Sequence, residues 1–577
     1  MAQNLDDHLK KYIVDSEIRP YTYRDHAVWR FILRQLKSFL KSKAHPFYVE
    51  GLEKTGISVD EIPSIPAISE KLRSFGWSAR PVSGFIPPAV FMEMQAAHIL
   101  PIARDMRSLD QLQYTPAPDI VHEAAGHAPM LAHPEYAQYL KNYAQVAKMA
   151  IISKQDLEIY AAIRQLSDLK SDSHADPKLI EKTQNKLDLL TKNLSHLSEA
   201  TLLSRMNWWT AEYGLIGTLE DPKILGAGLL SSVGEAKWCL NPQVKKIPLT
   251  IDCIKYSYDI TEPQPQLFVT PDFAHLSKVL NELSETMAYK TGGLKGLAKA
   301  KIAETVCSVE LNTGLQISGI VSDFELSPQN EITFIKLAGP TQLSYEHQEI
   351  PGHSKNYHLS GYSSPLGSLI SFPNRCTSTL SLDEWKQAGL NFNPSEESLL
   401  EWTHGFKLQA HFKTKIVKDG KILILTFTNA HLAHKGKDYF LPAWGEFDLA
   451  LGLKVKSVFG GPADRLSYGE IDEFTLSRIP TPEYSIQDKK SFDIYSEIRR
   501  LRNEKQNFSK LNSLFFIAKN EIPEEWLIFI EILELAKFDN DYSLTKAVLE
   551  HLKTYPYSEN VKSSINDGIQ ISDRIQI

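Results

Sequence analysis

The spacing of apolar residues changes twice along the chain, and this change limits the folds that it can adopt. Apolar side chains recur every three or four residues in 22–40, and the stretch from 60 to 240 is mostly of the same helical kind. Residues 305–340 alternate instead between apolar and polar side chains and contain turn signals. A helical pattern returns from about 485 to 570. The sequence therefore predicts a multidomain protein.

The predicted order is a mainly α-helical region with a few short strands, a β-rich domain and a C-terminal helical module. We expect boundaries at 1–298, 299–482 and 483–577, which fits 577 residues at about 150 residues per domain. Residues 411–428 read as a β-hairpin with Asp419-Gly420 at its turn. Two helices are expected at 154–169 and 176–204. The β-rich domain is expected to be a sandwich or a barrel.

Charge and cysteine usage exclude several classes of protein. The 63 basic and 70 acidic residues leave a formal charge of −7, and no long basic run suggests a nucleic-acid partner. The four cysteines lie far apart without CxxC spacing, which is typical of a reducing compartment. The polar N-terminus has no signal core, and the apolar stretch 526–536 contains two glutamates. We expect a cytoplasmic protein without a membrane partner.

The densest chemical motif is YTPAPDIVHEAAGHAP at 114–129, in which Asp119 is placed to cap a helix and two histidines follow. His122 and His127 lie five apart, whereas the zinc-hydrolase pattern HExxH places its histidines four apart. In an ideal α-helix, residues five apart diverge by about 140°. Both imidazoles can therefore reach one metal ion only if the helix ends or distorts, which Gly126 would permit.

A third ligand is available in the motif WWTAEYGL at 208–215. Glu212 is a carboxylate among apolar and aromatic residues, where an unpaired charge would be costly to bury. With His122 and His127 it would complete a set of two histidines and one carboxylate. Such a set leaves coordination positions open and suits non-haem Fe(II) oxygen chemistry.

At these residues the sequence resembles the pterin-dependent aromatic amino acid hydroxylases, of the phenylalanine 4-monooxygenase type. Three motifs carry the resemblance most strongly: YTPAPDIVHEAAGHAPML at 114–131, WWTAEYGLIG at 208–217 and GAGLLSSVGE at 226–235. RPVSGFIPPAVF at 80–91 and YTYRDHAVWRFILRQLK at 21–37 match more loosely, and all five stand in family order. The resemblance covers about residues 20–290.

The resemblance implies the roles of individual residues. The iron ligands would be His122, His127 and Glu212. The pterin-binding residues would be Gly84, Phe85, Ile86, Phe91 and Glu123. The residues at the substrate would be Arg107, Thr115, Pro118, Trp208, Tyr213, Ser231 and Glu235. The Arg107 guanidinium would hold the substrate carboxylate, because its planar fork pairs with a carboxylate through two hydrogen bonds.

The resemblance also implies the reaction and its cofactors. Fe(II) and tetrahydrobiopterin, or a related tetrahydropterin, would serve a monooxygenation in which O2 supplies the oxygen that enters the ring of an aromatic amino acid. L-Phenylalanine, giving L-tyrosine, is the substrate expected for such a chain. Residues 1–298 would be the catalytic domain, with a helical insertion at about 150–200. The sequence indicates no role for 299–577 and no oligomeric state.

The same residues leave two other functions open. A zinc-dependent hydrolase could use His122 and His127 as ligands and Glu123 as its general base, but the longer spacing and the other motifs argue against it. A non-catalytic sensor or scaffold could retain the fold and act through the C-terminal domains, although the complete ligand set disfavours that. The metal content and the pterin requirement of the purified protein distinguish the three hypotheses.

Overall fold

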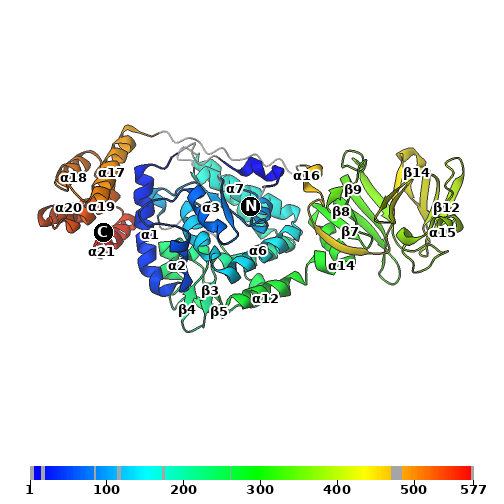
Figure 1. Ribbon diagram of the computed structural model, residues 1–577, viewed down its shortest axis with the longest axis horizontal. Coiled ribbons are helices and arrows are strands. Elements are labelled where there is room, and N and C mark those ends of the chain that lie inside the picture. Colours follow the sequence, from blue (N-terminus) through cyan, green and yellow to red (C-terminus); the bar gives the residue numbers. More distant parts are fainter. Residues whose placement is uncertain are drawn as a thin grey trace. The chain divides into compact units, whose positions relative to one another are not determined.

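A computed structural model describes residues 5–14, 20–82, 86–112, 118–171, 176–259, 262–469 and 484–573 (Figure 1). The chain forms two compact units. The first contains Met1–Ala144, Arg205–Val279 and Thr475–Ile577, and the second contains Gln145–Ser204 and Leu280–Phe474. Helices and strands occur in both, as the sequence predicted for a multidomain protein. Within the described ranges, no helix combines the length and the apolar character that crossing a membrane requires.

The first unit is mainly helical. Its short strands form a parallel pair, β1 with β2, and a four-stranded sheet in the order β4-β3-β6-β5. These strands are β1 (Ser78–Val82), β2 (Ile99–Ala103), β3 (Leu215–Gly217), β4 (Pro222–Ile224), β5 (Lys245–Pro248) and β6 (Gln266–Thr270). Before the last five helices, its helices and helical turns are η1 (Asp7–Tyr12), α1 (Tyr23–Lys43), α2 (Phe47–Lys54), α3 (Ile65–Arg73), α4 (Pro88–Ala96), η2 (Leu109–Gln111), η3 (Val121–His127), α5 (Ala128–Leu131), η4 (Trp208–Glu212), α10 (Ala227–Leu230), α11 (Val233–Trp238) and η5 (Ile251–Lys255). The chain passes between the two units within α6 (Pro134–Met149), α9 (Glu199–Asn207) and α12 (Phe273–Ser284).

The last five helices of the chain belong to this first unit. They are α17 (Ile486–Glu504), α18 (Lys510–Glu521), α19 (Trp526–Phe538), α20 (Tyr542–Thr554) and α21 (Glu559–Ser572). Helix α1, which begins at a capping box on Thr22, lies beside α17, α19 and α21 (Figure 1). The stretch 526–536 is a buried helix, as the sequence indicated.

Buried ion pairs join α19 to α1 and to α17. Glu531 and Glu534 of α19 have side chains only 3% and 4% exposed. Arg30 of α1 pairs with both carboxylates, at 3.0 Å from Glu531, and Arg34 pairs with Glu534. Arg502 of α17 pairs with Glu531. Charges this deeply buried need partners, and here each carboxylate has at least two.

The second unit combines helices with two antiparallel sheets. Strands β10-β9-β8-β7-β17 form one sheet, with β11 paired to β9, and β12-β13-β14-β15 form the other, with β16 paired to β14. A single apolar cluster includes Ile317 of the first sheet and Ile424 of the second. The strands are β7 (Val306–Leu311), β8 (Leu315–Leu326), β9 (Ile332–Tyr345), β10 (Gln348–Glu349), β11 (Gly361–Pro365), β12 (Glu397–Glu401), β13 (Lys407–Lys418), β14 (Lys421–His434), β15 (Lys437–Phe440), β16 (Phe447–Ala450) and β17 (Val455–Gly460). The helices and helical turns are α7 (Lys154–Ser171), α8 (Pro177–Lys192), α13 (Ala288–Thr291), α14 (Gly293–Ala303), η6 (Thr377–Thr379), α15 (Leu382–Gln387), η7 (Pro442–Trp444) and α16 (Arg465–Tyr468).

The structure confirms the predicted hairpin of this unit and corrects one predicted helix. The predicted hairpin is β13 and β14, and Asp419 (φ 50°) and Gly420 (φ 74°) form its turn. The single helix expected at 176–204 is wrong, because α8 ends at Lys192 and α9 begins at Glu199. Between them, the backbone N–H and the hydroxyl of Ser195 both donate to the Gln155 side chain. These bonds hold the chain in a non-helical turn.

Candidate metal centre and its surroundings

Two π-helical turns bring the predicted ligands together. His122 and His127 lie on η3, and the Ala128 N–H bonds to the Glu123 carbonyl, five residues earlier. Because a π-helix closes its hydrogen bonds over five residues, side chains five apart lie one turn apart on the same face. The expected distortion is therefore a π-helical turn, and not an end of the helix at Gly126. Glu212 closes a second such turn, η4, where the Tyr213 N–H donates to the Trp208 carbonyl at 2.7 Å.

Glycine allows these turns to approach their neighbours closely. A Cβ on Gly126 would lie 2.7 Å from the carbonyl oxygen of Ala227, at the start of α10. A Cβ on Gly226 would lie 2.2 Å from the carbonyl oxygen of Glu212. Both distances are far shorter than a carbon–oxygen contact allows. Gly126 therefore serves the packing of η3 against α10.

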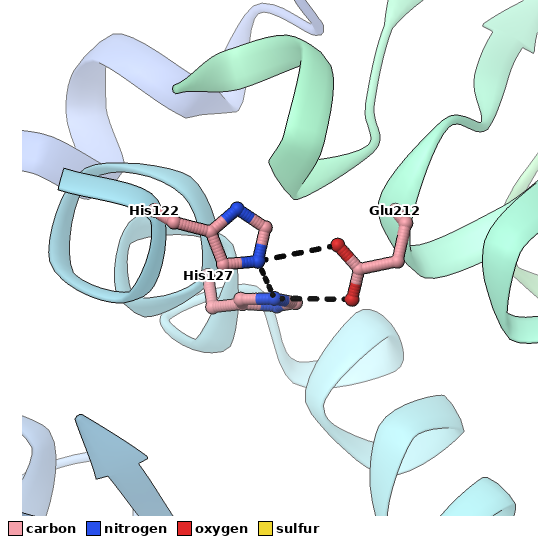
Figure 2. Close-up of side chains that lie close together, drawn as sticks. All are labelled: His122, His127 and Glu212. Carbon is pink, nitrogen blue, oxygen red and sulfur yellow. Dashed lines mark hydrogen bonds and ion pairs between the residues drawn. The ribbon is translucent and has the colours of Figure 1, made fainter. Parts of the chain in front are cut away.

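The three side chains converge on one point (Figure 2). Nε2 of His122 lies 3.3 Å from Oε2 of Glu212, and Nε2 of His127 lies 3.3 Å from Oε1. The two Nε2 atoms are 3.2 Å apart. Donor atoms about 3.3 Å apart fit a transition-metal ion with bonds of about 2.0–2.2 Å. The residues therefore suit a two-histidine, one-carboxylate metal centre.

A hydrogen bond fixes the orientation of the His122 ring. The Ser231 hydroxyl donates to the Ala227 carbonyl at 2.7 Å, so its oxygen can accept a hydrogen bond. Nδ1 of His122 lies 3.2 Å from this oxygen and is therefore the protonated nitrogen. The lone pair of Nε2 then points at the convergence point, which is the tautomer that a metal ligand needs.

The two carboxyl groups of the site have opposite pKa shifts. Burial alone would raise the pKa of Glu212, but His127 and His122 outweigh it and hold that pKa well below its usual range. Burial raises the pKa of Glu123 to about 8, with Glu212 and Asp119 acting in the same direction and His127 opposing them. Oε2 of Glu123 makes no hydrogen bond within the described part of the chain. Its burial beside Glu212 and Asp119 therefore favours the protonated form of Glu123.

Arg107 and Asp119 form a buried pair next to the histidines. Nε and Nη2 of Arg107 donate to the two carboxylate oxygens of Asp119 at 2.7 and 2.8 Å. The same carboxylate accepts the backbone N–H of His122 at 3.0 Å, so Asp119 caps the helix as predicted. Sequence reasoning missed its pairing with Arg107. Nη1 of Arg107 lies 3.4 Å from the carbonyl oxygen of Ser231, the residue whose hydroxyl contacts Nδ1 of His122.

Aromatic rings form a wall near Glu212. Trp208 is stacked between Tyr213, at 4.5 Å between ring centroids, and Tyr258, at 4.3 Å. The interplanar angles of 19° and 9° make this a three-ring stack. Trp208 and Tyr213 were predicted here, whereas Tyr258 was missed because it lies outside the recognised motifs. A stack of this kind is a rigid, largely apolar surface.

A cavity opens beside the metal centre. His127 and Glu212 line one side, and the rest of its lining includes Phe91, Trp77 and Asn207. Phe91 also packs against an apolar cluster that includes the buried Ile86, so two of the predicted pterin residues lie at one cluster. The remaining predicted residues are placed as follows: Pro118 is exposed, Glu235 is buried with its pKa raised to about 7 by burial, and Gly84, Phe85 and Thr115 lie outside the described residues.

Two histidines and one carboxylate arranged in this way are typical of mononuclear non-haem metal enzymes. Residues 4–163 and 175–292 match the family model of the biopterin-dependent aromatic amino acid hydroxylases. Through this region the chain belongs to the pterin-dependent aromatic amino acid hydroxylase family and is a monooxygenase of that type.

Individual relatives are about a quarter identical to the chain over the regions that match. Phenylalanine-4-hydroxylase of Ralstonia nicotianae is 27% identical over 298 residues, 49% of this chain and 81% of the relative. The Bos taurus enzyme is 28% identical over 273 residues, 46% of this chain and 51% of the relative. The solved phenylalanine hydroxylase of Chromobacterium violaceum with bound iron(III) and 7,8-dihydrobiopterin is 25% identical. That match covers 49% of this chain and 87% of the other, with a TM-score of 0.39.

Proposed function

We propose that the chain hydroxylates the ring of L-phenylalanine to give L-tyrosine, using O2, Fe(II) and tetrahydrobiopterin or a related tetrahydropterin. The convergence of His122, His127 and Glu212 carries this proposal, because three protein ligands leave coordination positions for other groups. The family membership supports the reaction class. The choice of phenylalanine rests on the relatives, which are named for that substrate.

His122, His127 and Glu212 would hold the iron, with Ser231 keeping Nδ1 of His122 protonated. When bound, iron and tetrahydropterin together supply the activation of O2 and the two electrons that a monooxygenation needs. The protein contributes the anionic ligand, because the pKa of Glu212 lies well below its usual range beside the two histidines, whose attraction outweighs the opposing effect of burial.

The pterin would bind on the Phe91 side of the centre. Phe91 lines the small cavity next to His127 and Glu212 and presents a ring on which a planar heterocycle can stack. Glu123 would donate a hydrogen bond to the cofactor, because burial raises its pKa to about 8 and one of its oxygens has no partner in the described residues. We assign Gly84, Phe85 and Ile86 to the same binding loop from the motif that they occupy.

The amino acid would bind between the aromatic wall and Arg107. Trp208 and Tyr213 would contact the substrate ring, and excluding water there favours oxygen transfer to the ring over side reactions. Arg107 would bind the substrate carboxylate through the N–H groups that Asp119 does not use. Thr115, Pro118, Ser231 and Glu235 would complete the substrate site.

We also propose the domain boundaries that the sequence pattern indicates. Residues 1–298 would be the catalytic domain with its insertion at about 150–200, followed by the β-rich domain 299–482 and the helical module 483–577.

The four cysteines are unpaired, which supports a cytoplasmic location.

A reconstitution assay on the full chain tests the function. Metal-stripped protein receives Fe(II), tetrahydrobiopterin and phenylalanine in air, and tyrosine is measured by chromatography. Tyrosine should form only when both the metal and the pterin are present. Glu212→Ala should abolish its formation, whereas Glu220→Ala, at an exposed glutamate of the same unit, should leave it unchanged.

Two results would contradict the proposal. Full activity of Glu212→Ala would show that Glu212 is not a ligand. Turnover of tyrosine or tryptophan in preference to phenylalanine would keep the reaction class and change the substrate.

A further inference from the structure

A second group of two histidines and one carboxylate lies in the second unit, outside the family match. His353 and His358 are on the loop between β10 and β11, and Asp448 is on β16. Their side chains are 7%, 9% and 2% exposed. The loop adjoins one sheet and β16 belongs to the other, so the group lies where the two sheets of this unit meet.

The donor atoms form a triangle of the size that a metal ion needs. Nδ1 of His353 lies 3.1 Å from Nε2 of His358, and Oδ2 of Asp448 lies 3.8 Å from each of these nitrogens. From these three edges, a point about 2.1 Å from all three atoms exists, which is the usual length of zinc bonds to imidazole and carboxylate. Calcium would need bonds of about 2.3–2.6 Å and oxygen ligands.

Hydrogen bonds alone do not account for the arrangement. A separation of 3.8 Å is too long for a hydrogen bond, so Asp448 bonds to neither imidazole. Its other oxygen accepts the Thr426 hydroxyl at 2.6 Å. The nearby Tyr357 hydroxyl donates to Glu446 at 3.1 Å. Among the described residues, no lysine or arginine forms an ion pair with Asp448.

The group places two imidazole nitrogens and one carboxylate oxygen close together in a buried position. Imidazole and carboxylate are both common ligands of zinc. The three side chains therefore offer a metal ion a compact set of donor atoms.

The backbone holds both histidines in place. The N–H of His353 donates to the Ile350 carbonyl at 2.9 Å, and its own carbonyl accepts the Leu343 N–H at 3.0 Å. The carbonyl of His358 accepts the Thr341 N–H at 3.1 Å. Ligands fixed by such bonds lose little entropy when they bind an ion.

We propose that His353, His358 and Asp448 bind a divalent transition-metal ion of the zinc type, which ties the β10–β11 loop to β16. The ion would neutralise the buried carboxylate and join the two sheets. This inference is independent of the hydroxylase function, because the second site shares no residue with the first.

Zinc titration of the full chain tests the site. Protein stripped with a chelator is titrated with Zn(II) in competition with a chromophoric chelator. His358→Ala and Asp448→Asn should each bind one equivalent fewer than the unsubstituted chain. His431→Ala is the matched control, because His431 also faces a carboxylate, Asp438 at 2.8 Å, but has an exposed side chain; it should bind as many equivalents as the unsubstituted chain. Equivalents bound elsewhere are common to all variants and cancel in the difference.

A second measurement does not depend on changing the proposed ligands. In Glu212→Ala protein, Co(II) should give the visible absorption of a nitrogen- and oxygen-ligated ion, and Zn(II) should remove it. Absence of that absorption would overturn the proposal, as would full zinc stoichiometry in folded His358→Ala and Asp448→Asn. Failure of the hydroxylase assay alone would leave these results unaffected.

Discussion

The ion pairs around Glu534 give the most quantitative prediction of the structure. Glu534→Ala removes a carboxylate whose side chain is 4% exposed and which pairs with Arg30 and Arg34. Arg30, itself 5% exposed, would keep only Glu531 as a buried partner, at 3.0 Å. Breaking one partner of a buried pair costs about 3–5 kcal/mol, because the remaining charge stays desolvated. That cost is a large share of the stability of a typical domain, about 5–15 kcal/mol.

Amide hydrogen exchange in α19 is the appropriate assay, since it reports the opening of that helix without assuming one transition for the whole chain. At 1.4 kcal/mol per factor of ten, the expected loss of protection is about two to three and a half powers of ten. Glu559→Ala is the control: its side chain is 88% exposed and pairs only with Lys562, so the exchange should not change. A loss of less than tenfold in Glu534→Ala would refute the reasoning that these charges stabilise the contact of α1 with α19.

Three further predictions concern the surroundings of the metal centre. Gly126→Ala should push η3 away from α10, because the new Cβ would lie 2.7 Å from the Ala227 carbonyl oxygen. Metal analysis should then show a loss of iron, and a normal iron content would contradict the packing argument. Ser231→Ala removes the hydroxyl that holds the proton of His122 on Nδ1, and should weaken iron binding about 10- to 100-fold. Competition with a chelator measures this affinity, and an unchanged affinity would contradict the prediction. Burial raises the pKa of Glu235 from 4.5 to about 7. Between these two pH values the folded chain keeps a proton that the unfolded chain has released, so the free energy of unfolding should fall as the pH rises from about 4.5 to 7. Glu235→Gln should reduce that fall in urea unfolding curves, and identical pH profiles would count against it.

The candidate ligand residues could be picked out from the sequence because their chemistry is local. His122, His127 and Glu212 stand out by residue type, and Asp119 by its place at the start of a helix. The π-helical turn was not predictable, because a spacing of five in the sequence does not reveal how the backbone will wind. Sequence reasoning could say only that an ideal α-helix would separate the two imidazoles.

Contacts between distant residues could not be predicted at all. Arg30 and Glu534 are 504 positions apart, and His358 and Asp448 are brought together only by the packing of two sheets. The helix expected at 176–204 failed for a similar reason, since its break depends on the side chain of Gln155, 40 positions before Ser195. Apolar periodicity describes one segment at a time and contains no information about such partners.

The most direct test of the central claim is the fate of oxygen in a single turnover. Phenylalanine, Fe(II)-loaded protein and tetrahydrobiopterin are mixed with isotopically labelled O2, and the product is analysed by mass spectrometry. A monooxygenase centred on His122, His127 and Glu212 should place one labelled atom in the hydroxyl group of tyrosine, and Glu212→Ala should form no labelled product. Unlabelled tyrosine, or no tyrosine from protein whose iron site is full, would contradict the assignment.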